Sequence, residues 1–211
     1  MHAMRYTLLA DGSSDAVLRY ILNWLIERHT TACFEPQWAD LRKLPKVPKT
    51  LTERIRVAVS LYPCDLLFVH RDAERESCEK RIAEIQQAVS DATSKPVVCV
   101  IPVRMQEAWL IFDEIAIRRA AGCPNGKMPL DLPDLSRIEN EPDPKTLLHT
   151  LLRVASGYHG RRAKQFQPNV HTHRLGELIT DFGPLRRLPA FQALESDLVH
   201  ALRKIGCPAL T

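Results

Sequence analysis

The sequence lacks several features that would place it in a common class of proteins. None of its apolar runs approaches the roughly 20 residues that a helix needs to cross a bilayer. The opening MHAMRYTLLADG contains no apolar segment with a small-residue cleavage site, so we expect neither a signal peptide nor a membrane partner. Motifs of the forms G-x-S-x-G, G-x-x-x-x-G-K-S/T and G-x-G-x-x-G are also missing, which argues against serine hydrolases, P-loop NTPases and dinucleotide enzymes.

Closely spaced cysteine pairs are absent as well. The chain has six cysteines, but none form a C-x-x-C motif and the gaps between them are large and irregular. This spacing argues against a zinc site and predicts small, buried, unpaired side chains. A reduced chain of this kind is typical of a cytoplasmic protein.

The charge of the chain is distributed unevenly along its length. Residues 1–150 carry 20 Lys/Arg and 21 Asp/Glu, whereas residues 151–211 carry 9 and 4, so the net charges are −1 and +5. A basic C-terminal part fits a polyanionic partner such as nucleic acid. It fits a merely solvated surface equally well, and charge alone does not decide between the two.

Hydrophobic periodicity predicts an alternation of strands and helices in the first half of the chain. We expect strands within 4–10, 34–41, 63–74 and 95–103. We expect helices over 14–29 with Ser13 or Ser14 as cap, over 50–62 with Thr50 or Thr52 near its cap, over 76–93, and over 106–122 closed by Gly122. This order predicts an α/β fold with a mostly parallel central sheet flanked by helices.

The second half of the chain has a different pattern. Residues 123–145 are rich in Pro, Asp and Asn and predict a long surface loop, and three helical stretches follow at 144–157, 172–183 and 189–206. We therefore divide the chain into an α/β core, 1–122, and a loop with a helical C-terminal extension packed on it, 123–211.

Acidic residues follow three of the predicted strands. Asp11 ends the first strand and Asp15 lies about one helical turn later, while Asp72 and Glu74 follow the third strand and Glu107 follows the fourth. Each acid also has a purely structural explanation that involves no ligand. Asp11, Asp15 and Glu107 would be turn or helix-start residues, and the other two acids would lie at a solvated strand end.

The shared position of these acids is more informative than any one of them. Ligands gather at the carboxyl ends of strands in open parallel sheets. Residues i and i+2 of an extended strand point the same way, so Asp72 and Glu74 are expected to converge. Crowded carboxylates repel each other, and Mg²⁺ or Mn²⁺ relieves that repulsion because hard cations prefer oxygen ligands. The pattern favours a metal site for phosphate chemistry.

These motifs resemble the Toprim superfamily. Toprim domains carry an acid–Gly step after the first strand and a D-x-D motif at a later strand tip, where this chain has DGSSD (11–15) and DAE (72–74). EAW at 107–109 with Asp113, DPK at 143–145 and the C-terminal LGELITDFGPLRRLPAFQALESDLVHAL are similar to small stand-alone Toprim proteins related to the OLD-family nucleases. The chain departs from the family in having Asp at 11 and 15, and Glu at 74.

The resemblance implies a Toprim-like Rossmannoid fold and a metal-dependent nuclease, often found in phage defence or mobile elements. On this resemblance Asp11, Asp72 and Glu107 would be catalytic, and Asp11, Asp15, Asp72 and Glu74 would hold Mg²⁺ or Mn²⁺. Contacts to nucleic-acid phosphates would come from Lys145, Arg162 and Lys164, the last two within a basic loop over 157–165. An ATPase or another defence-system protein would be a possible partner.

Two other functions remain open at the level of sequence. The shifted acids could mark a catalytically degenerate module that acts through a protein partner, and a phosphotransfer enzyme on a small phosphorylated substrate is a third possibility. Three histidines add little: His171 and His173 form an H-x-H in an expected loop, and His70 is expected to be an ordinary strand-end side chain.

Overall fold

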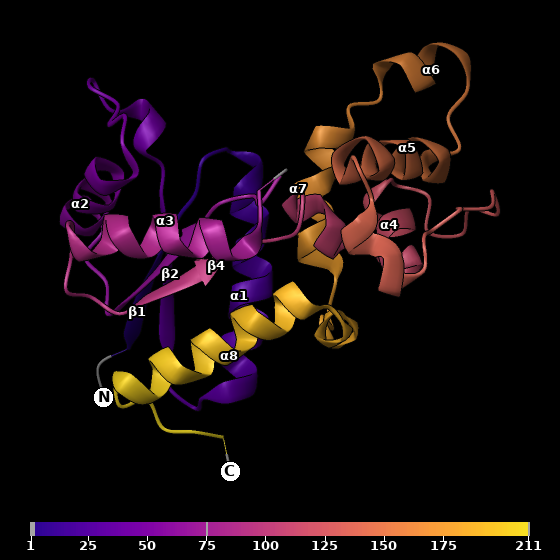
Figure 1. Cartoon of the computed structure of the whole chain (residues 1–211). Helices are drawn as coiled ribbons and strands as arrows, with labels where there is room; N and C mark the ends of the chain where they lie inside the picture. Colours follow the sequence, from indigo (N-terminus) through magenta and orange to yellow (C-terminus); the bar gives the residue numbers. More distant parts are fainter. Residues whose placement is uncertain (1–2, 75, 211) are drawn as a thin grey trace.

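A computed structural model describes residues 3–74 and 76–210. Four parallel strands form one sheet in the order β2-β1-β3-β4 (Figure 1). The strands are β1 (Met4–Leu9), β2 (Phe34–Ala39), β3 (Leu66–His70) and β4 (Val97–Val100). The predicted α/β class and parallel sheet are confirmed.

Helices connect the strands and make up most of the second half of the chain. The α-helices are α1 (Leu18–His29), α2 (Leu51–Leu61), α3 (Cys78–Ser90), α4 (Glu114–Ala120), α5 (Pro144–Ser156), α6 (Gly160–Gln165), α7 (Pro168–Leu178) and α8 (Pro189–Lys204). Short 3-10 helices are η1 (Ser14–Val17), η2 (Leu41–Lys43), η3 (Gln106–Leu110), η4 (Leu135–Asn140) and η5 (Gly183–Arg187). Among the described residues, no helix has the length and apolar character needed to cross a bilayer.

Two apolar layers sandwich the sheet. The smaller layer packs α2 and α3 against one face through residues such as Leu9, Ile55 and Val69. The larger layer packs α1 and α8 against the other face and continues into the helical part formed by α4, α5 and α7 (Figure 1). α8 is the last helix of the chain, yet it packs against β4. It is therefore part of the larger apolar layer on the sheet and not only of the helical part.

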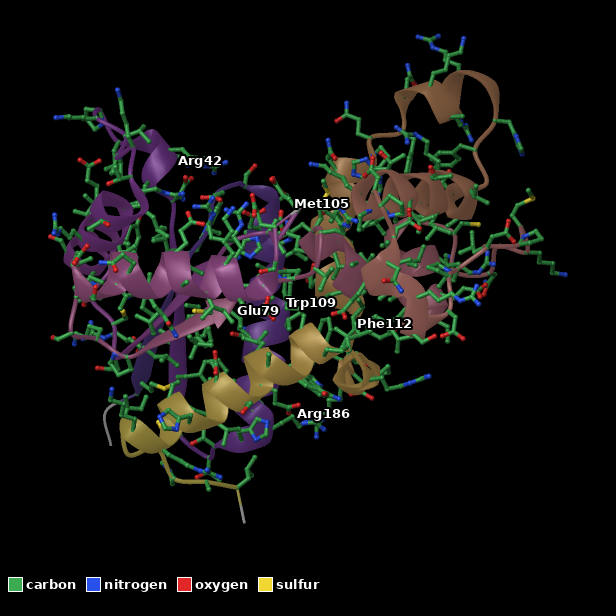
Figure 2. All side chains as sticks on the ribbon, viewed as in Figure 1. Arg42, Glu79, Met105, Trp109, Phe112 and Arg186 are labelled. Atoms are coloured by element: carbon green, nitrogen blue, oxygen red, sulfur yellow. The ribbon has the colours of Figure 1, made fainter. Side chains whose placement is uncertain are left out.

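One predicted helix is broken in two. Residues 106–122 do not form one helix: η3 ends at Leu110, Ile111 has non-helical dihedral angles, and α4 begins at Glu114. The Asp113 side chain accepts a hydrogen bond from the Ala116 N–H (2.9 Å) and so starts a new helix. Figure 2 shows Met105, Trp109 and Phe112 where the chain passes from the sheet into the helical part.

The basic segment 157–165 is also different from the expected loop. It contains α6, and His171 and His173 lie in α7 rather than in a loop. Gly157 ends α5 in the left-handed conformation (φ +63°), which favours glycine, and allows the chain to reverse into α6. Gly176 lets α7 lie directly against η1, because a Cβ there would overlap the Val17 side chain.

The predicted helix caps have mixed outcomes. Thr50 caps α2 in a capping box with Glu53, as expected. Neither Ser13 nor Ser14 makes a side-chain cap bond at the first helix. Ser14 instead donates a hydrogen bond to the Asp15 carboxylate (3.0 Å). The hydroxyl group in the turn after β1 therefore positions this carboxylate and does not cap the helix.

Glu195 on α8 ties three elements together and gives the fold a pH-dependent contact. Its Oε1 lies 2.6 Å from His29 Nε2 on α1 and 2.6 Å from Arg186 Nη2 on η5. Burial by itself raises the pKa of Glu195, but the hydrogen bonds from Arg186 and His29 outweigh burial and lower it. The stabilisation is therefore present above the unfolded-state pKa and is lost as the pH falls through the lower, folded-state pKa.

Replacing Glu195 with Gln is expected to lower the free energy of unfolding by about 1–2 kcal/mol at pH 7. The difference from wild type should disappear in acid, where the wild-type carboxylate is protonated. Urea denaturation at several pH values measures this. Glu177→Gln is the control: its pair with Arg174 is about half exposed and should contribute about 0–0.5 kcal/mol. A Glu195→Gln effect that does not change with pH would contradict the assignment.

Candidate functional site

Strand alternation separates the acids at the carboxyl edge of the sheet. Leu9 and Val69 pack toward α2 and α3, whereas Phe68 belongs to the layer on the opposite face. Asp11, two residues after Leu9, contacts Arg54 of α2. Asp72, four residues after Phe68, contacts His70 and lies on the opposite side from Asp11.

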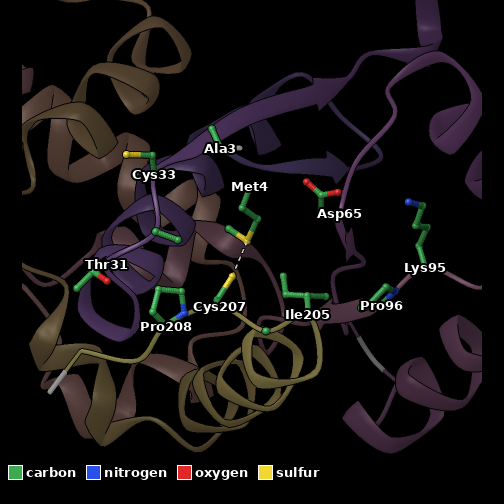
Figure 3. Close-up of a pocket in the computed structure, with 12 residues that line it drawn as sticks. Ala3, Met4, Thr31, Cys33, Asp65, Lys95, Pro96, Ile205, Cys207 and Pro208 are labelled. Atoms are coloured by element: carbon green, nitrogen blue, oxygen red, sulfur yellow. Dashed lines mark hydrogen bonds between the residues drawn. The ribbon is translucent and has the colours of Figure 1, made fainter. Parts of the chain in front are cut away.

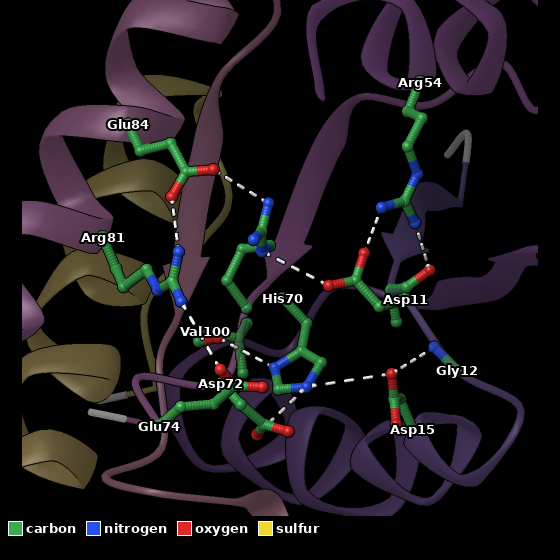
Figure 4. A network of polar contacts seen from close by, with 12 residues as sticks. Asp11, Gly12, Asp15, Arg54, His70, Asp72, Glu74, Arg81, Glu84 and Val100 are labelled. Atoms are coloured by element: carbon green, nitrogen blue, oxygen red, sulfur yellow. Dashed lines mark hydrogen bonds and ion pairs between the residues drawn. The ribbon is translucent and has the colours of Figure 1, made fainter. Parts of the chain in front are cut away.

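Asp11 is held by two arginines (Figure 4). One carboxylate oxygen pairs with Arg54 Nη1, and the other lies 3.3 Å from Arg71 Nε. Arg71 continues to Glu84 of α3 at 2.9 Å. Both oxygens of Asp11 therefore face guanidinium groups, which neutralise its charge.

Asp15, His70, Asp72 and Gln106 form what we call the acid–histidine cluster. The Asp15 carboxylate accepts hydrogen bonds from Gly12 N–H (2.6 Å) and Gln106 Nε2 (2.9 Å). Gln106 also donates its backbone N–H to Asp72 Oδ1 (3.1 Å). One residue of η3 thus fixes acids that follow two different strands.

The buried His70 ring lies between the two acids of this cluster (Figure 4). Its Nδ1 is 3.0 Å from the Val100 carbonyl oxygen, which only accepts, so Nδ1 carries a proton. Its Nε2 is then directed at Asp72 Oδ1 (3.5 Å) and Asp15 Oδ2 (3.9 Å).

A polar pocket opens beside the acid–histidine cluster. Its volume is about 250 Å³, and it lies between the turn after β1, η3, α5 and α7. It is lined by Ser13, Ser14, Glu107, Lys145, His149, Asn169, Thr172 and His173. Glu107 is buried, with an exposed fraction of 4%, and brings a carboxylate to a pocket that also holds a lysine.

Two of the acids have raised pKa values. Burial raises the pKa of Asp72, and Asp15 and Glu74 raise it further, against the lowering effect of His70 and the Gln106 N–H. Burial also raises the pKa of Glu107, with Asp72 and Asp15 adding to it and Lys145 opposing it. The carboxylates of Asp15, Asp72 and Glu107 therefore interact with one another in a partly desolvated space.

Glu74 stands apart from these acids. The strand β3 ends at His70, and Glu74 has a positive φ of +54°, so the expected alternation that would aim Asp72 and Glu74 at one point does not continue this far. The Glu74 side chain is 66% exposed, and one of its oxygens lies 3.9 Å from Arg81 Nη2.

The acids were tested for their fit to the expected Mg²⁺ or Mn²⁺. Over residues 3–74 and 76–210, no three His, Cys, Asp or Glu side chains lie close enough together to hold one ion as they stand. The donor chemistry of Asp15, Asp72 and Glu107 nevertheless suits a hard cation, because these interacting carboxylates repel one another and supply the oxygen ligands that such a cation prefers. The expectation that Asp11 and Glu74 join them as ligands stays a prediction.

The three basic residues expected to contact phosphate are not all in one place. Lys145 lies at the start of α5 and lines the polar pocket. Arg162 and Lys164 lie on α6, are exposed, and are not among the residues that line that pocket.

Several residues of the site were missed from the sequence. Gln106 carried no signal except its place before EAW, and His70 was expected to be an ordinary strand-end side chain. His149 and Asn169 come from helices of the second half of the chain. Only the packing of α5 and α7 beside η1 and η3 brings them to the acids.

A separate cavity lies at the opposite edge of the sheet (Figure 3). Its volume is about 570 Å³, and its lining includes Met4, Asp65, Pro96 and Cys207. Met4, Asp65 and Pro96 mark the amino ends of strands β1, β3 and β4. The cavity is therefore remote from the carboxyl edge, where Asp11, Asp15, Asp72 and Glu107 lie.

Comparison of the chain with protein-family models finds no matching family, and comparisons with curated proteins and with solved structures find no match either. The function is therefore argued from the geometry of the acid–histidine cluster and the polar pocket.

Proposed function

We propose that this chain hydrolyses phosphodiester bonds of nucleic acid with the help of Mg²⁺ or Mn²⁺, at the acid–histidine cluster and the adjoining polar pocket. The observation that carries the proposal is a group of three interacting carboxylates beside a pocket that also contains Lys145: Asp15 and Glu107 are buried, and Asp72 is partly buried. A structural core has no use for such a group, because buried like charges destabilise the folded state unless a ligand compensates them.

Each residue of the site has a role in this proposal. Asp15, Asp72 and Glu107 would hold the cation once their side chains had moved closer together, and the bound cation would stabilise the charge that develops on the phosphate. Lys145 would bind a phosphate oxygen as a point charge. Gln106 is a positioning residue, since its side chain holds Asp15 and its backbone N–H holds Asp72.

The direct test is cleavage of labelled single-stranded and duplex DNA and RNA by the purified chain. Cleavage is expected in Mn²⁺ or Mg²⁺ and should be lost on adding EDTA and restored by excess metal. No cleavage of any of these substrates in either metal, or cleavage that EDTA leaves unchanged, would contradict the proposal.

A second function is favoured by the environment of Asp11. In the Toprim-like pattern the first acid is a central group, and here Arg54 and Arg71 occupy both of its oxygens. A degenerate module that acts through a protein partner would fit this neutralised acid. Binding of Mn²⁺ measured by calorimetry, without cleavage of any nucleic acid, would favour this second function.

A further inference from the structure

The segment from Pro144 to Gly176 contains no acidic residue. It includes α5, α6 and most of α7, and it carries six Lys/Arg and four His. In the described part of the chain, the side chains of Arg153, Arg161, Arg162 and Lys164 take part in no ion pair, whereas Arg174 pairs with Glu177 just beyond the segment. Unpaired cations without acids among them form a surface for a polyanion.

The first part of this surface is a stripe along α5. Lys145, His149 and Arg153 are four residues apart, so they lie on one side of the helix with a rise of about 6 Å per step. Lys145 and His149 line the polar pocket. Burial lowers the pKa of His149, Lys145 and Arg153 lower it further, and Asp143, the residue before α5, opposes them.

The second part continues from Arg153 to the turn before α6. A hollow of about 240 Å³ is lined by Arg153, Tyr158, His159 and Phe166, among others. The Tyr158 ring is 43% exposed and meets Phe166 edge to face, with ring centroids 5.9 Å apart. An exposed aromatic ring between cations is the arrangement on which unpaired bases stack.

The third part is α6 itself, which has no buried residue. Arg161, Arg162 and Lys164 are all exposed on it, and the helix lies at the outer end of the helical part, far from the sheet (Figure 1). The cations therefore continue from the polar pocket, along α5 and past Tyr158, to the outer end of the molecule.

We propose that this surface binds one unpaired strand of nucleic acid and leads it into the polar pocket. We call it the α5–α6 track, and it consists of Lys145, His149, Arg153, Tyr158, Arg161, Arg162 and Lys164. The proposal rests on the proposed function for the pocket at its inner end, and it adds the class of substrate. A pocket of about 250 Å³ admits a phosphate with part of a nucleotide but no base-paired duplex, and Tyr158 gives unpaired bases a ring to stack on.

The test is binding in EDTA, so that it does not depend on cleavage. Fluorescence anisotropy would follow labelled oligo(dT) and oligo(U) of about 20 nucleotides, and a duplex of the same length, over a series of salt concentrations. Arg161→Gln/Arg162→Gln is expected to weaken single-strand binding about 10-fold at low salt. It should also reduce the slope of log K against log salt by about 1.4, since each lost phosphate contact on a single strand is worth about 0.7.

The matched control is Arg203→Gln/Lys204→Gln, which removes the same charge from exposed positions at the end of α8. Its affinity should stay within about 2-fold of wild type and its salt slope should not change. Equal losses in the two double variants, or binding of the duplex as tight as that of the single strand, would overturn the proposal.

The hydrolytic function and the α5–α6 track are contradicted by different results in these experiments. If the wild-type chain binds single strands through the track and cleaves nothing in Mn²⁺, the hydrolytic function is wrong and the track stands. If the chain cleaves nucleic acid and Arg161→Gln/Arg162→Gln binds single strands as wild type does, the track is wrong and the hydrolytic function stands.

Discussion

Replacing Asp72 with Asn should reduce metal-dependent cleavage of nucleic acid by about 10²–10⁴-fold. The substitution keeps the shape of the side chain and an oxygen that can accept the Gln106 N–H, but it removes a negative charge that lies 3.5 Å from His70 Nε2 and that interacts with Glu107. Initial rates on a labelled strand in Mn²⁺ would measure the loss. Circular dichroism would confirm that the variant is folded.

Glu74→Gln is the matched control for this substitution. Glu74 lies two residues further along the chain, but its side chain is exposed and contacts no member of the acid–histidine cluster by hydrogen bond or ion pair. If Asp15, Asp72 and Glu107 hold the ion without Glu74, the cleavage rate of the control should stay within about 3-fold of wild type, because the Glu74 charge is solvated and is the smallest contribution to the raised pKa of Asp72. If Glu74→Gln were as damaging as Asp72→Asn, the site would lie at the exposed strand tip and not at the buried cluster.

Replacing Trp109 with Ala is expected to lower the free energy of unfolding by about 3–5 kcal/mol. Trp109 is fully buried in η3, where it packs edge to face on Phe191 of α8, with ring centroids 5.4 Å apart and planes at 83°. Removing the indole leaves a cavity between the segment that carries Gln106 and Glu107 and the helix that covers the sheet. Urea denaturation monitored by circular dichroism would measure the change.

Trp109→Phe separates the packing of this residue from its polar atom. The indole Nε1 is buried and has no hydrogen-bond partner among residues 3–74 and 76–210, so Phe keeps an aromatic ring on Phe191 and removes an unsatisfied donor. We expect Trp109→Phe to lose less than half of the stability that Trp109→Ala loses. Equal losses in the free energy of unfolding of the two variants would show that the stability contributed by Trp109 does not come from its edge-to-face packing on Phe191.

The elements that the sequence predicted best are those with their own local signal. The apolar run Leu66–Val69 predicted a buried parallel strand, and all five residues of β3 are buried. Thr50 was one of the two residues predicted near the cap of α2, and the structure shows it in a capping box with Glu53, complete within four residues. In each case the chemistry that decides the structure lies within a few residues of the chain.

The elements that were wrong depend on distant contacts. The segment 106–122 has a helical pattern, yet it does not form one helix. Gln106 is hydrogen-bonded to Asp15 and Trp109 packs on Phe191, and the helix is interrupted between Leu110 and Glu114. The pairing of Asp11 with Arg54 could not be foreseen either, because nothing near Asp11 in the sequence indicates which face of the sheet its carboxylate meets.

The sequence by itself determined that acids follow the strands of a parallel α/β sheet, because alternating apolar patterns and strand-end acids are local properties of the chain. Only the tertiary structure decided which acids share a site. Strand alternation turned Asp11 toward the arginines on one face and Asp72 toward His70 on the other. The packing of α5 and α7 beside η3 then added Lys145 and His149 to a pocket that their neighbours in sequence do not predict.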